Sequence, residues 1–133
     1  MTEAEEIIEA FKGVSKPDYS DTVPVMDKRS KKDGYETVFV DTKKFDSAWK
    51  EDKSFYIGLD GEGGIGKRYD GFLKFIDTHD TFEQSVVGFD IYNKRPSFID
   101  GRHRFAVLRD LGMKKIPVSV DPDSLEQIQK LYT

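Results

Sequence analysis

Apolar residues recur along this chain with two different spacings, and together they predict a mixture of helices and strands. Phe72, Phe75 and Ile76 follow a helical spacing and are predicted to form the buried side of a helix, whereas Val38 and Val40 are predicted on one face of a strand with Phe39 on the other. By the same patterns, helices are predicted at residues 3–12, 42–50, 67–78 and 102–111, with a last helix that Asp121 and Pro122 begin and that runs through Leu131. Strands are predicted at residues 35–40, 54–59, 86–92, 96–99 and 115–120.

Breaker residues predict where these elements end. The pair 93–94 is typical of a tight turn between strands, and the pair 100–101 of a turn from strand to helix. Gly112 is expected to end that helix. Pro117 lacks an N–H to donate, so its strand lies at a sheet edge or begins near the proline.

The order of these elements predicts one α+β domain at residues 35–133, a small mixed sheet flanked by helices. Residues 1–34 are expected to form an N-terminal helix and a loop that carries the basic run at 28–32. This run is interpreted as a solvated loop in preference to a nucleic-acid contact.

Composition narrows the classes of protein that fit. The 133 residues carry a formal net charge of −4, so a site for a nucleotide or nucleic acid must be a local basic patch. The chain has no cysteine, which excludes disulfides, thiolate metal sites and cysteine catalysis. It shows no apolar run long enough to span a membrane and no signal-peptide pattern, so a cytoplasmic protein without a membrane partner is expected.

The segment 100–104 carries the clearest chemistry. The first turn of a helix has backbone N–H groups without helical partners and a partial positive charge, which favours acidic residues there. This chain instead places Arg102, His103 and Arg104 after Gly101. Together these groups make a cradle for a phosphate. The alternative is that the arginines face solvent or pair with acids such as Asp100, and that His103 is a hydrogen-bonded, partly buried histidine.

The run Asp100-Gly101-Arg102-His103-Arg104 continues through Leu111-Gly112 and is followed by Ile116-Pro117-Val118. This pattern resembles the ParB N-terminal domain/sulfiredoxin superfamily, in the form of its small stand-alone members from phages and bacteria. The resemblance covers residues 84–120 and implies the fold of that superfamily. It departs at Arg102, which stands where sulfiredoxin has its reactive cysteine, so sulfinic-acid reduction is excluded. The short stretch after Val120 leads us to expect no helix-turn-helix domain and no binding of a partition site.

The resemblance implies that Gly101, His103 and Arg104 hold the phosphates of a nucleotide, which is ATP, ADP or CTP, together with Mg²⁺. The leading hypothesis is a nucleotide-dependent phosphotransferase, with a small molecule as acceptor, or a nucleotide hydrolase. Alternatives are a non-catalytic regulatory module that binds a nucleotide and, less favoured because the chain is acidic, a nuclease.

Residues 61–68 nearly form a P-loop, but Arg68 stands where that motif needs a Ser or Thr for Mg²⁺. We interpret these residues as a loop that closes over the pocket at 100–104 and adds the charges of Lys67 and Arg68 to it, the alternative being a plain flexible turn. The expectation is that the two loops face each other across a single pocket.

Candidates for acid–base chemistry are less sharply defined. Asp100 and His103 are the leading ones, although Asp100 is favoured as a cap of the following helix over a ligand of Mg²⁺. Further candidates for a general base are the carboxylates of Asp41, Asp60 and Glu62. His79 is expected at the surface, and the two histidines do not predict a zinc site.

Overall fold

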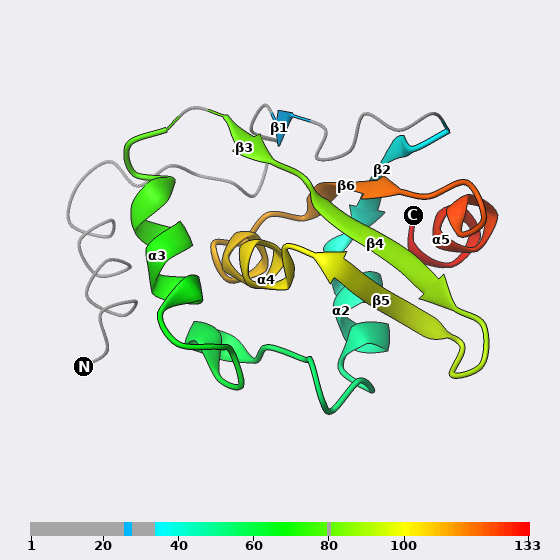
Figure 1. Ribbon diagram of the computed structural model, residues 1–133, viewed down its shortest axis with the longest axis horizontal. Coiled ribbons are helices and arrows are strands. Elements are labelled where there is room, and N and C mark those ends of the chain that lie inside the picture. Colours follow the sequence, from blue (N-terminus) through cyan, green and yellow to red (C-terminus); the bar gives the residue numbers. More distant parts are fainter. Residues whose placement is uncertain (1–25, 28–33, 80) are drawn as a thin grey trace.

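A computed structural model describes residues 26–27, 34–79 and 81–133 of the chain. The described residues form a single α+β domain with a four-stranded mixed sheet and four α-helices (Figure 1). The helix predicted at residues 3–12 and the basic run at 28–32 lie outside the described residues.

The sheet has the strand order β2-β6-β4-β5. These strands are β2 (Glu36–Asp41), β4 (Ser85–Asp90), β5 (Arg95–Asp100) and β6 (Lys115–Val120). β6 pairs antiparallel with β2 and parallel with β4, and β4 pairs antiparallel with β5. A separate short ladder pairs β1 (Met26–Asp27) in parallel with β3 (Phe82–Glu83). The mixed pairing places β6 in the interior of the sheet.

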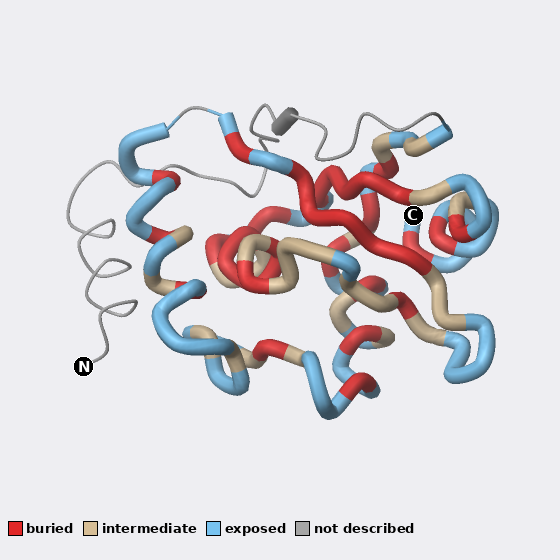
Figure 2. The backbone as a smooth tube through the Cα atoms, viewed as in Figure 1, coloured by how far each residue is buried: buried red, intermediate tan, exposed pale blue. Residues whose placement is uncertain are grey.

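The helices pack around an aromatic centre. They are α2 (Thr42–Trp49), α3 (Arg68–Phe75), α4 (Arg102–Asp110) and α5 (Leu125–Tyr132), with a short 3-10 helix η1 (Leu59–Gly61) before α3. The ring of Phe45 lies 5.5, 4.7 and 5.6 Å, centroid to centroid, from those of Phe98, Phe105 and Tyr132. Figure 2 shows the buried backbone concentrated in β4, β6 and α4. The core therefore holds α4 firmly, and with it the turn that begins this helix.

Most of the predicted elements are confirmed, with shifts of a few residues at their ends. The strands predicted at 35–40, 86–92, 96–99 and 115–120 are β2, β4, β5 and β6, and the helices predicted at 42–50, 67–78 and 102–111 are α2, α3 and α4. The chain turns between β4 and β5 at Lys94, whose φ is 55°, and Gly112, with φ of 90°, follows the end of α4. Local patterns were sufficient for these elements because each contributes apolar residues to the core or packs them against it.

The strand predicted at 54–59 is wrong. The Phe55 side chain in this segment is 56% exposed. The carbonyl groups of Ile57 and Gly58 accept hydrogen bonds from Arg109, at 2.6 and 3.0 Å, instead of from another strand. Because a side chain supplies these donors, the segment runs as turns that lead into η1.

Pro117 does not mark an edge strand, because β6 lies between β2 and β4. The pairing of β6 with β4 begins at Val118, one residue after the proline. The second alternative, a proline near the start of its strand, describes this position. Pro117 lies just outside the ladder with β4 and opposite Phe39 in the ladder with β2.

The last helix begins later than predicted. Its first residue is Leu125 and its N-cap is Ser124, so the role expected for Asp121 and Pro122 at its start is wrong. The Ser124 hydroxyl accepts a hydrogen bond from the backbone N–H of Phe89 at 2.9 Å. This bond fixes the preceding residues as a turn against β4, and the helix starts only after it.

Candidate functional site

A cavity of about 900 Å³ lies beside the N-terminus of α4. Residues of α3, β3, the end of β5 and the first turn of α4 line this cavity. One part of the lining carries the charged side chains of Arg68, Arg102 and Arg104, and another carries aromatic rings. Its volume lies within the range, about 300–1,000 Å³, of sites that hold a small molecule.

Gly101 is the residue on which the first turn of α4 depends. It is the N-cap, with φ of 82°, and a Cβ at this position would lie 2.9 Å from the Cα of Ser85. Ser85 Oγ donates a hydrogen bond to the Gly101 carbonyl at 2.7 Å, and the same carbonyl accepts the first helical bond, from Phe105 N, at 3.1 Å. The predicted turn from strand to helix is confirmed. The N-cap role expected for Asp100 is wrong, because a residue in the left-handed conformation follows it and takes that position.

His103 connects α4 to the glycine-rich loop. Its Nε2 accepts a hydrogen bond from the backbone N–H of Ile65 at 2.9 Å, so the proton of the neutral ring is on Nδ1. The side chain is buried, and burial together with the neighbouring charges of Arg102 and Arg68 lowers its pKa to about 4. At neutral pH the ring is therefore uncharged, with one nitrogen engaged and one N–H to donate.

The two arginines of the first turn have different surroundings. Arg104 lies 3.7 Å from carboxylate oxygens of both Asp100 and Glu83, so the pairing expected as the alternative is found for this arginine. Arg102 donates to the Phe55 carbonyl at 2.8 Å and lies 5.5 Å from the centre of that ring. Within the described part of the chain, no carboxylate forms an ion pair with Arg102. Arg102 is consequently the first-turn arginine whose charge is available to an anion.

The glycine-rich loop reaches the first turn of α4, as expected. A Cβ at Gly64 would lie 3.1 Å from the His103 ring, so glycine permits this close approach. Arg68 lines the cavity near Arg102. Burial lowers the pKa of Arg102, and the positive charge of Arg68 lowers it further. Lys67 is exposed at the N-terminus of α3 and is not among the described residues that line the cavity. The two loops thus share one cavity, to which Arg68 contributes and Lys67 does not.

The remaining acid–base candidates lie elsewhere. Asp41 is the N-cap of α2 and accepts a hydrogen bond from Lys44 N at 3.0 Å. Asp60 donates its backbone N–H to Asp110 at 3.2 Å, and Glu62 lines a second hollow together with Arg109 and Asp110. Among the described residues, no group of three or more His, Cys, Asp or Glu side chains is placed to hold a metal ion.

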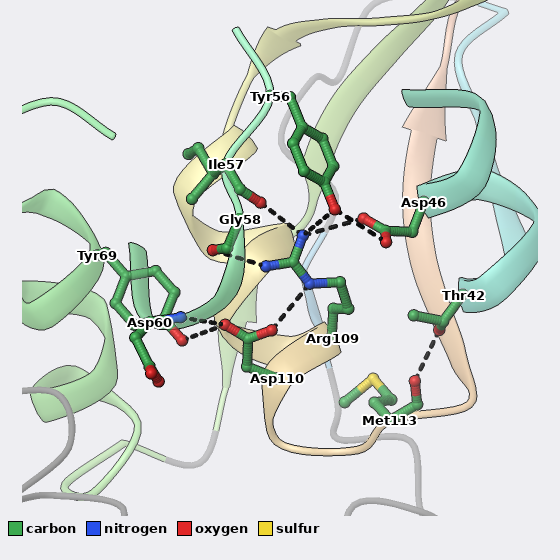
Figure 3. A network of polar contacts seen from close by, with 10 residues as sticks. All are labelled: Thr42, Asp46, Tyr56, Ile57, Gly58, Asp60, Tyr69, Arg109, Asp110 and Met113. Carbon is green, nitrogen blue, oxygen red and sulfur yellow. Dashed lines mark hydrogen bonds and ion pairs between the residues drawn. The ribbon is translucent and has the colours of Figure 1, made fainter. Parts of the chain in front are cut away.

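A polar network around Arg109, which the sequence analysis did not identify, fixes the opposite end of α4. The Arg109 guanidinium contacts the carboxylates of Asp46 and Asp110, each at 2.9 Å, in addition to two backbone carbonyls (Figure 3). Asp110 also accepts a hydrogen bond from the Tyr69 hydroxyl at 2.5 Å. The pKa of Tyr69 is raised, mainly by burial and further by this hydrogen bond. This network joins α2, α3 and α4 and holds the segment before the glycine-rich loop.

The aromatic lining of the cavity was missed as well. Phe75, predicted to be buried, is 38% exposed and lines the cavity with Phe72 and Phe82. The buried side of α3 is formed by Tyr69 and Leu73, and Ile76, which follows the helix, is buried as predicted. Helical spacing identified a side of α3 that is rich in phenylalanine, but it does not show whether this side faces the core or a cavity.

Comparisons of the chain with models of protein families, with curated proteins and with solved structures give no match. None of the helices in the described residues is long and apolar enough to cross a membrane.

Proposed function

We propose that this protein binds a nucleotide in the cavity and acts on its phosphate chain, as a nucleotide-dependent phosphotransferase or hydrolase with a ParB/sulfiredoxin-like fold. The observation that carries this proposal is the convergence of three features on one cavity: the first turn of α4 with Arg102 and His103, Arg68 from the glycine-rich loop, and an aromatic wall. The order of strand, glycine turn, helix and strand in residues 84–120 supports the resemblance on which the finer assignment rests.

The phosphates would bind at the first turn of α4. The backbone N–H groups of Arg102 and His103 precede the first helical hydrogen bond, which begins at Phe105. The Arg102 guanidinium adds a charge-assisted donor, and His103 adds the N–H of its Nδ1. A bound polyphosphate would also offset the repulsion between Arg68 and Arg102.

Carboxylates within reach of the phosphates favour catalysis over binding alone. Asp100 and Glu83 line the same cavity as Arg102. Mg²⁺ in nucleotide sites is commonly held by one or two carboxylates, water and the phosphates themselves, and these two side chains fit that donor set. When bound, the ion would supply positive charge to the phosphate chain. Asp100 would then position a water or hydroxyl nucleophile, and the arginines would neutralise the developing charge.

A non-catalytic nucleotide-binding module is the second candidate. It is favoured by the engagement of His103 Nε2 with the glycine-rich loop, which leaves this histidine as a donor and not as a base. It is also favoured by the contact of Asp100 with Arg104. A nuclease has less support, because the charged lining belongs to a cavity of a net-acidic chain and not to a broad basic surface.

Two measurements on the full chain test the proposal. Thermal shift and calorimetry with ATP, ADP, CTP, GTP and single-stranded nucleic acid, with and without Mg²⁺, should show binding of nucleotides. Chromatography of the products should then show loss of the terminal phosphate, and Asp100→Asn should abolish turnover while nucleotide binding persists. Binding without turnover would select the non-catalytic module, and binding of nucleic acid alone would contradict both nucleotide functions.

A further inference from the structure

The aromatic wall of the cavity is an ordered stack of rings. We use this name for Phe72, Phe75, His79 and Phe82, all of which line the cavity. The rings of Phe72 and Phe75 are 6.0 Å apart with 14° between their planes, and those of Phe75 and His79 are 3.6 Å apart with 6° between them. Phe82 meets the other two phenylalanines edge-on, at 5.5 and 6.2 Å. Parallel rings with a supporting edge form a platform on which a further planar group can stack.

Part of this wall also belongs to the core, because Phe82 is 3% exposed and Phe72 packs against the buried residues; the exposed phenylalanine of the wall is Phe75. Tyr69 and Leu73 are 4% and 0% exposed, whereas Phe75 is 38% exposed. A phenylalanine in this position gains little from the core. His79 covers one face of the Phe75 ring, so a planar group that enters the cavity beside Arg68 and Arg102 would stack on the remaining exposed part of the wall.

We propose that the aromatic wall binds the base of the nucleotide and prefers purines over pyrimidines, with little distinction between adenine and guanine. This inference rests on the proposed function, since the phosphates must occupy the first turn of α4 for the base to reach the wall. The ligand is thus a purine nucleoside polyphosphate, selected by its charge at one end and by its ring area at the other.

The preference for ring area follows from the groups that surround the wall. A two-ring base covers more of a stacked platform than a one-ring base, and stacking tolerates any base because every base has a π-face. The Thr81 hydroxyl at this part of the lining is both a donor and an acceptor, so it does not tell adenine from guanine. His79 Nδ1 already contacts the Phe75 carbonyl at 2.9 Å. Specificity for one purine would need fixed donors and acceptors, and these described side chains do not provide such a set.

Calorimetry with the full chain in Mg²⁺ tests the inference by comparing ATP, GTP, CTP and inorganic tripolyphosphate. Stacking of a base predicts that ATP binds about tenfold or more tightly than tripolyphosphate and that CTP lies between them. ATP and GTP should agree within about threefold, because stacking reads ring area and not the base edge. Phe75→Ala should bring the affinity for ATP close to that for tripolyphosphate and leave tripolyphosphate binding unchanged. Phe39→Ala removes an exposed phenylalanine of β2 outside the cavity and should change neither, which makes it the matched control.

A second variant reports stacking directly. The chain has one tryptophan, Trp49, which is fully buried. Phe75→Trp adds an exposed indole to the wall, and its fluorescence should be quenched by ATP and not by tripolyphosphate. Equal affinities for ATP and tripolyphosphate with no quenching would overturn the inference and leave the phosphate site intact. Tighter binding of CTP than of ATP would overturn the preference for purines. Failure of both ATP and tripolyphosphate to bind would overturn the proposed function and this inference with it.

Discussion

The two ends of α4 each carry arginine, but the surroundings of these arginines differ. At the C-terminal end, the Arg109 side chain is 10% exposed and contacts two carboxylates and two backbone carbonyls. At the N-terminal end, Arg102 has one backbone acceptor and the face of one ring. The difference separates two uses of the same residue: Arg109 has its acceptors within the protein and holds the fold together, whereas Arg102 has capacity for acceptors that a ligand would bring.

The largest effect is expected when Arg109 is changed to methionine, which keeps a similar length without the charge. Asp46 and Asp110 would lose a buried partner, and the carbonyls of Ile57 and Gly58 would lose their donor. Removal of one partner from such a network destabilises a protein by about 3–5 kcal/mol. Urea denaturation at neutral pH measures this loss.

Arg95→Met is the matched control for that measurement. Arg95 contacts a backbone carbonyl of Glu51 and lies 4.0 Å from Asp52, with a more exposed side chain. Its loss should change the free energy of unfolding by less than about 1 kcal/mol. Equal effects of the two substitutions would show that Arg109 is not the structural residue we take it to be.

The next largest effect is expected on ligand binding at the other end of the helix. Arg102→Met should weaken ATP binding by about 1.5–3 kcal/mol, the contribution of a charge-assisted hydrogen bond. The free energy of unfolding should change by no more than about 0.5 kcal/mol, because the substitution removes a cation from a helix N-terminus and breaks no ion pair among the described residues. Calorimetry measures the change in ATP affinity, and urea denaturation of the same sample measures the change in the free energy of unfolding. A large loss of stability with unchanged affinity would place Arg102 in the same structural class as Arg109.

The pH dependence of stability sharpens the comparison through His103. Its pKa is about 4 in the folded chain against 6.5 for the free side chain, so the folded state binds fewer protons between these values. Stability is therefore complete above about pH 6.5 and decreases as the pH falls toward 4, by a quantity on the order of 1–3 kcal/mol.

Urea denaturation at several pH values measures this slope. His103→Gln, whose amide oxygen can still accept the hydrogen bond from Ile65, should have a smaller slope over the same interval. An identical slope in the variant would mean that carboxylates, and not this histidine, determine the response to acid.

The smallest effect is a coupling between the two loops. Arg68 and Arg102 line one cavity, so the effects of Arg68→Ala and Arg102→Ala on ATP affinity should depart from additivity by about 0.5–1 kcal/mol. Lys67→Ala combined with Arg102→Ala should be additive within about 0.5 kcal/mol, because Lys67 does not contribute to the described lining of the cavity. Calorimetry on the three single and two double variants provides both cycles. Coupling in the Lys67 pair and none in the Arg68 pair would reverse this assignment.

The fold was predictable from the sequence wherever a segment determines its own structure. Gly101 and the apolar residues that follow it specify a turn and a helix without reference to the rest of the chain. The segment 54–59 misled the prediction because its backbone is satisfied by Arg109, a residue distant in sequence. The start of α5 was misplaced for a related reason, since a hydroxyl bound to β4 fixes the turn before it.

The candidate site was predictable to the same extent. The segment 100–104 could be identified because its unusual charge lies within one helical turn. The sequence did not show that Arg104 pairs with Asp100 or that Arg68, and not Lys67, lines the cavity. Both outcomes depend on contacts between elements that are distant in sequence. The exposure of Phe75 is of the same kind, because the spacing of α3 does not show what lies opposite to it.

The pairing of β6 with β2 has a consequence for how the chain folds. β4, β5 and α4 follow one another closely in sequence and can assemble around the Gly101 turn through local contacts. The ladder from Glu36 to Asp41, in contrast, pairs with residues from Val120 back to Lys115, across more than half of the chain. Closing so long a loop is entropically unfavourable and slow relative to the formation of a hairpin. We therefore expect the Gly101 turn to form early in folding and the sheet behind it to be completed in the rate-limiting step.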